Sequence, residues 1–178
     1  LWTRAPADDA SVTVRLQVAD DAQFTRLRVE RELGALAEHD HCLRVRVEGL
    51  QPGQRYHYRF LRLQAGEWVS SPPGITRTAP AANAATGGLR FAFMSCQDFG
   101  GRWYNTLVPL LDQELDFILH LGDFIYESVG DSSFQDVGGE RSIRFTDEAG
   151  ALRIGKRGND YLAAASLDNY RQLHREYR

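Results

Sequence analysis

Two segments of the sequence end in side chains that could bind a metal ion. The first, LRFAFMSCQD, carries Cys96 near its end, and the second, LDFILHLGDFIY, carries Asp123, with Tyr126 three residues later. Ligands and catalytic groups gather at the carboxyl edge of parallel sheets. A thiolate, a carboxylate and a phenolate that converge at such an edge would form a site for a cation.

The elements that would position these groups are two strands and a helix between them. The segment WYNTLVPLLDQE, residues 103–114, has leucines at helical spacing, so we predict a βαβ unit with parallel strands. Adjacent strands lie about 4.8 Å apart, which would allow groups at their ends to reach one ion. A helical turn after Asp123 would place Tyr126 on the same face as this carboxylate.

The paired motifs FMSCQDFG and DFILHLGDFIYES resemble the start of the catalytic domain of PhoD-like phosphatases, the alkaline phosphatase D family of metallophosphoesterases. Ordinary calcineurin-like phosphoesterases have Asp-x-His at the first motif. This chain has Ser95, Cys96 and Gln97 there instead, and these residues resemble the PhoD-like pattern. The resemblance implies ferric iron held by Cys96, Asp123 and Tyr126, together with calcium. It also implies an exported enzyme, periplasmic or extracellular, that hydrolyses phosphomonoesters and phosphodiesters.

The first half of the chain has an all-β pattern. Apolar and polar residues alternate over residues 12–18, 43–47 and 56–60, which predicts strands with one buried face. The segment EGLQPGQRY predicts a turn that leads into Tyr56, similar to the corner of fibronectin type III domains in which a tyrosine hydroxyl bonds to upstream backbone. We therefore predict a fibronectin type III-like β-sandwich over residues 1–85, with its first strand missing. The PhoD-like family carries such a domain ahead of its catalytic domain.

A linker and an irregular region follow. The small residues of AANAATGG predict a linker, after which residues 86–178 would form the N-terminal part of the PhoD-like catalytic domain. The chain beyond Glu127 is rich in glycine and charge without a sustained period, which predicts a long or disordered loop. Residues 161–178 predict a helix with Ser166 or Asp168 as its cap.

Composition limits the partners. The chain has 178 residues and a formal net charge of −3, so it gives no signal for a nucleic acid or a membrane surface. It has no apolar run as long as the roughly eighteen residues that a membrane span needs, and we recognise no signal peptide at its start. Cys42 and Cys96 lie in different predicted domains and cannot form a disulfide framework, which leaves the redox compartment open. The oligomeric state stays open as well.

Other polar residues have simpler interpretations. Asp98 follows Cys96 by two residues and is predicted to be an exposed loop carboxylate. His120 alternates with leucines and is predicted to be a core histidine with satisfied hydrogen bonds. A set of basic residues in the polar region is predicted to be a solvated charge run: Arg141, Arg144, Lys156 and Arg157.

Two strands and two helices cannot cover both faces of a parallel sheet or build a self-sufficient core. The resemblance implies that further strands and further ligands, from Asp, Asn and His, complete the catalytic domain. We therefore expect a fragment of a metal-dependent phosphoesterase that uses a metal-activated hydroxide and is inactive alone. Two alternatives remain open. One is a β-sandwich binding module with a degenerate, non-catalytic βαβ stub, and the other is a thiol enzyme with Cys96 as nucleophile.

Overall fold

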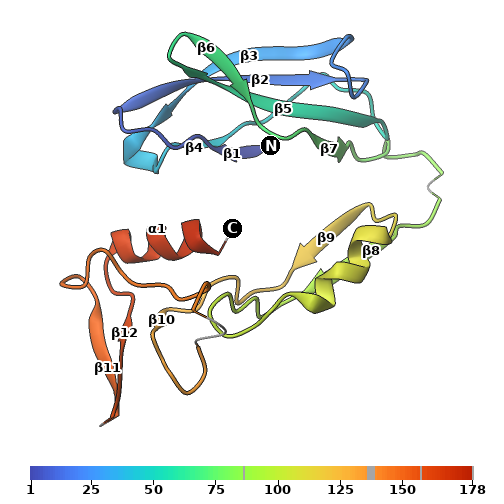
Figure 1. Cartoon of the computed structure of the whole chain (residues 1–178). Helices are drawn as coiled ribbons and strands as arrows, with labels where there is room; N and C mark the ends of the chain where they lie inside the picture. Colours follow the sequence, from blue (N-terminus) through green and yellow to red (C-terminus); the bar gives the residue numbers. More distant parts are fainter. Residues whose placement is uncertain (86, 136–138, 157, 178) are drawn as a thin grey trace. The chain divides into compact units, whose positions relative to one another are not determined.

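The computed structural model describes residues 1–85, 87–135, 139–156 and 158–177. The chain divides into two compact units, Leu1–Gly87 and Gly88–Arg178. Figure 1 shows strands throughout the first unit, whereas the second unit has shorter strands, a 3-10 helix and an α-helix. The fold is therefore rich in sheet and poor in helix.

Antiparallel strands build the first unit. Its larger sheet has the order β3-β2-β5-β6, with β7 also paired to β5, and β1 pairs with β4 in a smaller sheet. The bounds are β1 (Trp2–Arg4), β2 (Ser11–Ala19), β3 (Leu27–Leu36), β4 (Cys42–Arg44), β5 (Arg55–Gln64), β6 (Glu67–Ser70) and β7 (Gly74–Arg77), with a 3-10 turn η1 (Ala37–His39) before β4.

The core of the first unit confirms two of the three predicted strand patterns. Val14, Leu16 and Val18 alternate along β2 and are fully buried, and Tyr56 and Phe60 of β5 join them. The same apolar cluster includes residues beside the smaller sheet, so it fills the space between two layers. The third predicted segment forms only the short strand β4, and Val45 beyond it still exchanges two backbone hydrogen bonds of 2.8 Å with Leu1 and packs in the core.

The predicted hydrogen bond of Tyr56 is present. Its side chain is 2% exposed, and its hydroxyl accepts a hydrogen bond of 2.9 Å from the backbone N–H of Gln51. This bond closes the turn that precedes β5 and gives the buried hydroxyl of Tyr56 a partner.

Replacement of Tyr56 with phenylalanine is expected to lower the free energy of unfolding by about 1 kcal/mol, because the Gln51 N–H loses its acceptor. Urea unfolding of the two proteins measures the difference. The matched control is Tyr58→Phe on the same strand, since the Tyr58 hydroxyl is not the acceptor of this turn. Equal urea midpoints for wild type and Tyr56→Phe would contradict a stabilising role for the bond.

The second unit begins with the predicted pair of parallel strands, β8 (Phe91–Met94) and β9 (Phe117–His120). The connection differs from the prediction, because it contains a 3-10 helix, η2 (Asn105–Asp112), in place of an α-helix. Pro109 lies inside this segment. Proline has no N–H, and its ring clashes with the carbonyl four residues earlier, which prevents a regular α-helix here.

The two parallel strands leave apolar side chains in contact with solvent. Phe91 and Phe117 stack with their ring centroids 5.1 Å apart, yet both are about half exposed. Phe93 and Ile118 are exposed as well. Parallel sheets are usually covered on both faces, so this pair is an exception to the common arrangement.

The region after Glu127 contains a sheet that was predicted to be a loop. β10 (Ser128–Val129), β12 (Asn159–Ala163) and β11 (Leu152–Lys156) form three antiparallel strands in this order. The predicted start of the final helix was also wrong, because Tyr161 pairs with Ile154 in the sheet.

The α-helix α1 (Leu167–Glu176) starts at the predicted cap. The hydroxyl of Ser166 accepts from the backbone N–H of Asn169, whose side chain bonds back to complete a capping box. Leu173 is fully buried in the core of the unit with Phe145 and Tyr177. Arg178, at the end of the predicted helix, lies outside the described residues.

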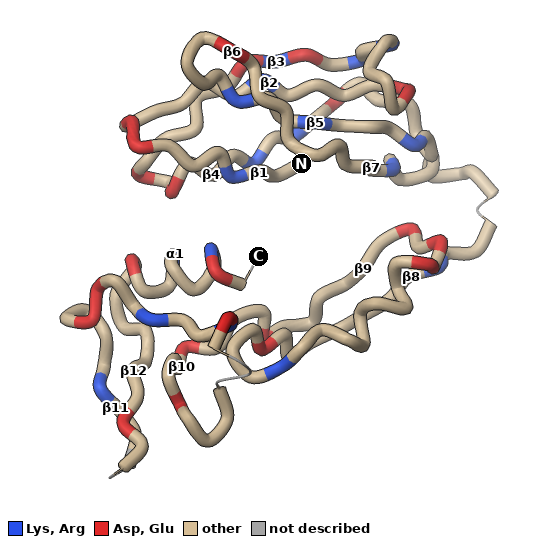
Figure 2. Tube along the Cα trace, in the orientation of Figure 1, with Lys and Arg blue, Asp and Glu red and all other residues tan. Residues whose placement is uncertain are grey.

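Charges of both signs are interspersed along each unit, without a long run of one sign among the described residues (Figure 2). None of the described helices is long and apolar enough to cross a membrane.

Candidate metal centre

Backbone pairing extends beyond the two parallel strands and sets the positions of the predicted ligands. The N–H of Cys96 donates to the carbonyl of Gly122 at 3.1 Å, and the N–H of Gln97 donates to the carbonyl of Asp123 at 2.9 Å. The loop that follows β8 is thus hydrogen-bonded to the loop that follows β9. This pairing brings Cys96 and Asp123 to the same edge of the sheet.

Both residues have a backbone conformation that is rare for side-chain-bearing residues. The φ angle is 61° at Cys96 and 54° at Asp123, in the left-handed region. No helical turn follows Asp123, and this residue itself has a left-handed backbone, so helical spacing does not place Tyr126 beside it. Left-handed residues of this kind store about 1–3 kcal/mol of strain each and cluster at functional sites.

The structure brings all three predicted ligands together. The Cys96 sulfur and the Tyr126 hydroxyl oxygen each lie 3.4 Å from the same carboxylate oxygen, Oδ2 of Asp123, and both are oriented to donate to it. The Cys96 sulfur also lies 3.4 Å from the Ser95 hydroxyl. Cys96 and Asp123 are exposed and Tyr126 is partly buried, so the three donors, Cys96, Asp123 and Tyr126, face an accessible site.

The electrostatics of the three donors favour a cation. Desolvation raises the pKa of Tyr126 to about 12, and contacts with Cys96 and Asp123 add to the shift. The phenol therefore keeps its proton at neutral pH when no cation is near, since its ionisation would add a charge beside a carboxylate. A bound cation would reverse this preference and stabilise the phenolate.

The donor set is a mixed one. Among the described residues, no group of three or more His, Cys, Asp and Glu side chains could hold a metal ion. The three donors consist of a cysteine, an aspartate and a tyrosine, so they are a different kind of set. Thiolate suits zinc or iron, and phenolate is a known ligand of iron, so the residues fit an iron ion.

Asp98 is not the exposed carboxylate that was predicted. It is 4% exposed, and its Oδ1 accepts from the backbone N–H of Gly101 at 3.2 Å and from the Tyr177 hydroxyl at 3.5 Å. Its Oδ2 is buried without a hydrogen-bond partner among the described residues. A Cβ atom at Gly101 would collide with this oxygen, so a side chain at position 101 would displace the carboxylate.

His120 is only half satisfied, in contrast to the prediction. Its Nδ1 accepts from the backbone N–H of Gly122 at 3.3 Å, whereas its Nε2 is buried without a partner in the described part of the chain. The imidazole ring meets Phe124 edge to face, and Phe124 in turn stacks against His174 of α1 with ring centroids 6.0 Å apart. These contacts connect the end of β9 to the helix.

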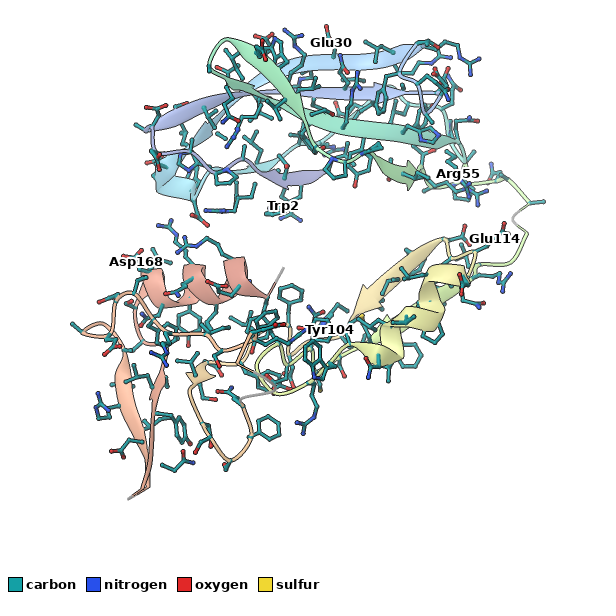
Figure 3. All side chains as sticks on the ribbon, in the orientation of Figure 1. Trp2, Glu30, Arg55, Tyr104, Glu114 and Asp168 are labelled. Atoms are coloured by element: carbon teal, nitrogen blue, oxygen red, sulfur yellow. The ribbon has the colours of Figure 1, made fainter. Side chains whose placement is uncertain are left out.

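Arg141 is packed and not solvated, contrary to the predicted charge run. Its Nε donates to the carbonyl of Phe99 at 2.7 Å, and its guanidinium lies over the rings of Phe99, Trp103 and Tyr104. Figure 3 labels Tyr104 in the second unit. Desolvation raises the pKa of Tyr104. Arg144 is exposed as predicted, while Arg157 and the side chain of Lys156 lie outside the described residues.

A cavity of about 580 Å³ lies in the second unit, with Arg141, Arg144, Tyr177 and several serines among its lining residues. The three donors are not part of the described lining. The donors therefore form an open site at the sheet edge and not the floor of this cavity.

Comparisons with known proteins cover both units. The model of the PhoD-like phosphatase N-terminal domain matches residues 1–80, and the PhoD-like phosphatase model matches residues 91–178. The chain belongs to the PhoD-like phosphatase family. It is 30% identical over 186 residues to alkaline phosphatase D of Bacillus subtilis (strain 168), an alignment that covers all of this chain and 28% of that protein.

A solved structure of PhoD gives the corresponding result in three dimensions. It matches 99% of this chain with a TM-score of 0.75 and 27% sequence identity, and the match covers 31% of the PhoD chain. The chain therefore spans less than a third of the length of these two relatives. The PhoD-like resemblance predicted from the two motifs is confirmed, and with it a relationship to phosphoesterases.

Proposed function

We propose that this chain carries part of the metal centre of a PhoD-like phosphoesterase, with Cys96, Asp123 and Tyr126 as ligands of one cation. The observation that supports it is the contact of one Asp123 oxygen with both the Cys96 sulfur and the Tyr126 hydroxyl, at the ends of two parallel strands. The donor chemistry fits iron, and the family resemblance adds the ferric state and calcium as a second cation.

Two of the three donors must lose a proton when the cation binds. The Cys96 thiol and the Tyr126 phenol both donate to Asp123, and each must lose its proton before it can act as an anionic ligand. Cation binding would therefore release protons, and the affinity would rise with pH. The bound cation supplies a Lewis acid for the hydrolysis of a phosphate ester. Asp123 is exposed, which leaves its carboxylate free to bridge to a second cation.

The proposed substrates are phosphate esters, in keeping with the similarity to alkaline phosphatase D. The family resemblance adds phosphodiesters to phosphomonoesters and implies an exported protein. The second cation needs ligands of its own. The described residues hold no group of three or more His, Cys, Asp and Glu side chains that could supply them. We therefore expect the 178-residue chain alone to hold one cation and to lack turnover.

Iron binding tests the ligand set. The chain loaded with ferric iron is expected to show a visible absorption band from the iron-bound phenolate, and Tyr126→Phe is expected to lose that band. The matched control is Tyr170→Phe, an exposed tyrosine of α1, which should keep it. A band that survives in Tyr126→Phe would remove this tyrosine from the ligand set. A chain that binds no iron, zinc or calcium would favour the binding-module alternative.

Turnover tests the expected incompleteness. With iron and calcium present, the chain is expected to hydrolyse p-nitrophenyl phosphate no faster than a Cys96→Ala control, because hydrolysis needs both cations fixed relative to phosphorus. A position error of about 1 Å already costs roughly a hundredfold in rate. Turnover that is sensitive to a chelator and absent from Cys96→Ala would instead mean that these residues contain a complete active site.

A further inference from the structure

Tyr177 contacts both loops that carry the three donors. Its hydroxyl accepts from the backbone N–H of Tyr126 at 3.3 Å and donates to Oδ1 of Asp98 at 3.5 Å. Its carbonyl accepts from the side-chain amide of Gln97 at 3.2 Å. Gln97 and Asp98 directly follow Cys96, so one residue is hydrogen-bonded to the loop of each strand.

The environment of Tyr177 keeps its hydroxyl in the form that both bonds need. Tyr177 is 3% exposed and Asp98 is 4% exposed, so water does not compete for these groups. A protonated phenol can donate one hydrogen bond and accept another at the same time.

The helix that ends at Tyr177 is firmly attached to the core of the second unit. Its capping box closes the first turn, and Leu173 is fully buried. The ring of Tyr177 packs against Phe99 with centroids 5.7 Å apart. One turn earlier, His174 stacks on Phe124, which lies between two of the donors in the sequence. The helix therefore provides a fixed surface against which both loops are held.

We propose that Tyr177 is a positioning residue of the metal centre, which sets the spacing between the Cys96 loop and the Tyr126 loop. This inference rests on the proposed function, because it requires the three donors to be ligands. Groups that orient ligands without touching the metal typically change metal affinity by about 10–100-fold when they are removed. Tyr177 acts on the backbone of one loop and on the side chains of the other.

The test replaces Tyr177 with phenylalanine in the 178-residue chain, which keeps the ring against Phe99 and removes only the hydroxyl. Two readouts are compared with wild type and with the exposed control Tyr170→Phe. The affinity for ferric iron is expected to fall about 10–100-fold in Tyr177→Phe and to stay unchanged in the control. In the metal-free chain, hydrogen exchange at the Tyr126 amide is expected to speed up, because that amide loses its acceptor.

The outcomes separate the inference from the proposed function. Unchanged iron affinity and unchanged Tyr126 amide exchange in Tyr177→Phe would overturn the inference. A Tyr177→Phe protein whose only change is a lower unfolding temperature would overturn it as well. A wild-type chain that binds no iron would overturn the proposed function, and the exchange result would then still decide whether Tyr177 ties the loops together. If Tyr177→Phe does not fold, Asp98→Asn weakens the same bond from the other side, and a smaller affinity loss is expected.

Discussion

Asp123→Asn is expected to weaken ferric iron binding more than about 100-fold. Loss of a group that only orients ligands typically costs about 10–100-fold in metal affinity, and Asp123 is proposed as a ligand itself. Asp123 is the member of the site that contacts both other donors, so its charge is central to the cluster. Asparagine has nearly the same shape and tolerates a left-handed backbone, so the fold should persist. Competition with a chelator of known affinity measures the change.

The matched control for this variant is Asp160→Asn. Asp160 is an exposed carboxylate on β12 of the same unit, and its replacement makes the same change in net charge. The control should bind iron as tightly as wild type. Equal weakening in both variants would mean that the unit's overall charge, and not a ligand bond, governs the affinity.

Leu173→Ala is expected to lower the free energy of unfolding of the second unit by about 2–5 kcal/mol, because the residue is fully buried and its removal leaves a cavity. Leu167→Ala on the same helix should change it by no more than about 0.5 kcal/mol, since Leu167 is 65% exposed. Chemical denaturation with Leu173→Ala, Leu167→Ala and wild type gives the comparison. A loss in Leu173→Ala as small as that in Leu167→Ala, at no more than about 0.5 kcal/mol, would show that α1 contributes little to the core.

Local sequence patterns predicted the strands that have strong alternation or long apolar runs. β2 and β5 alternate apolar and polar residues, and the burial of one face determines their form. β8 and β9 were predicted from short, mainly apolar runs, although their side chains stay largely exposed. The prediction of an α-helix between β8 and β9 was wrong. The leucine spacing favours an α-helix, but Pro109 interrupts the backbone hydrogen bonds that an α-helix needs.

The sheet formed by β10, β11 and β12 could not be read from periodicity. Its strands are short and mix apolar with polar or charged residues, which gives no sustained period. β11 pairs with β12 as a local hairpin, whereas the pairing of β10 with β12 joins residues that are distant in sequence. Tyr161 illustrates the difficulty. It continues the pattern of the following helix, yet cross-strand pairing with Ile154 holds it in β12.

The three donors were predicted from their places at strand ends, but the residues that hold them were not. The roles of Asp98 and Tyr177 depend on burial and on a contact across 79 residues of sequence, which no local pattern reports. Arg141 was missed for the same reason, because its aromatic partners precede it by about forty residues. The one available signal was the aromatic cluster of Phe99, Trp103 and Tyr104 just after the first motif.

The left-handed backbone at Cys96 and Asp123 has a consequence for the evolution of this chain in the laboratory. Glycine adopts that conformation without steric cost, so a glycine at either position would relax the backbone and delete a donor in one step. A screen of random variants for heat resistance alone would be free to discard both donors. A screen for iron binding would have to retain them together with their strain, so the two selections would drive these loop ends toward different sequences.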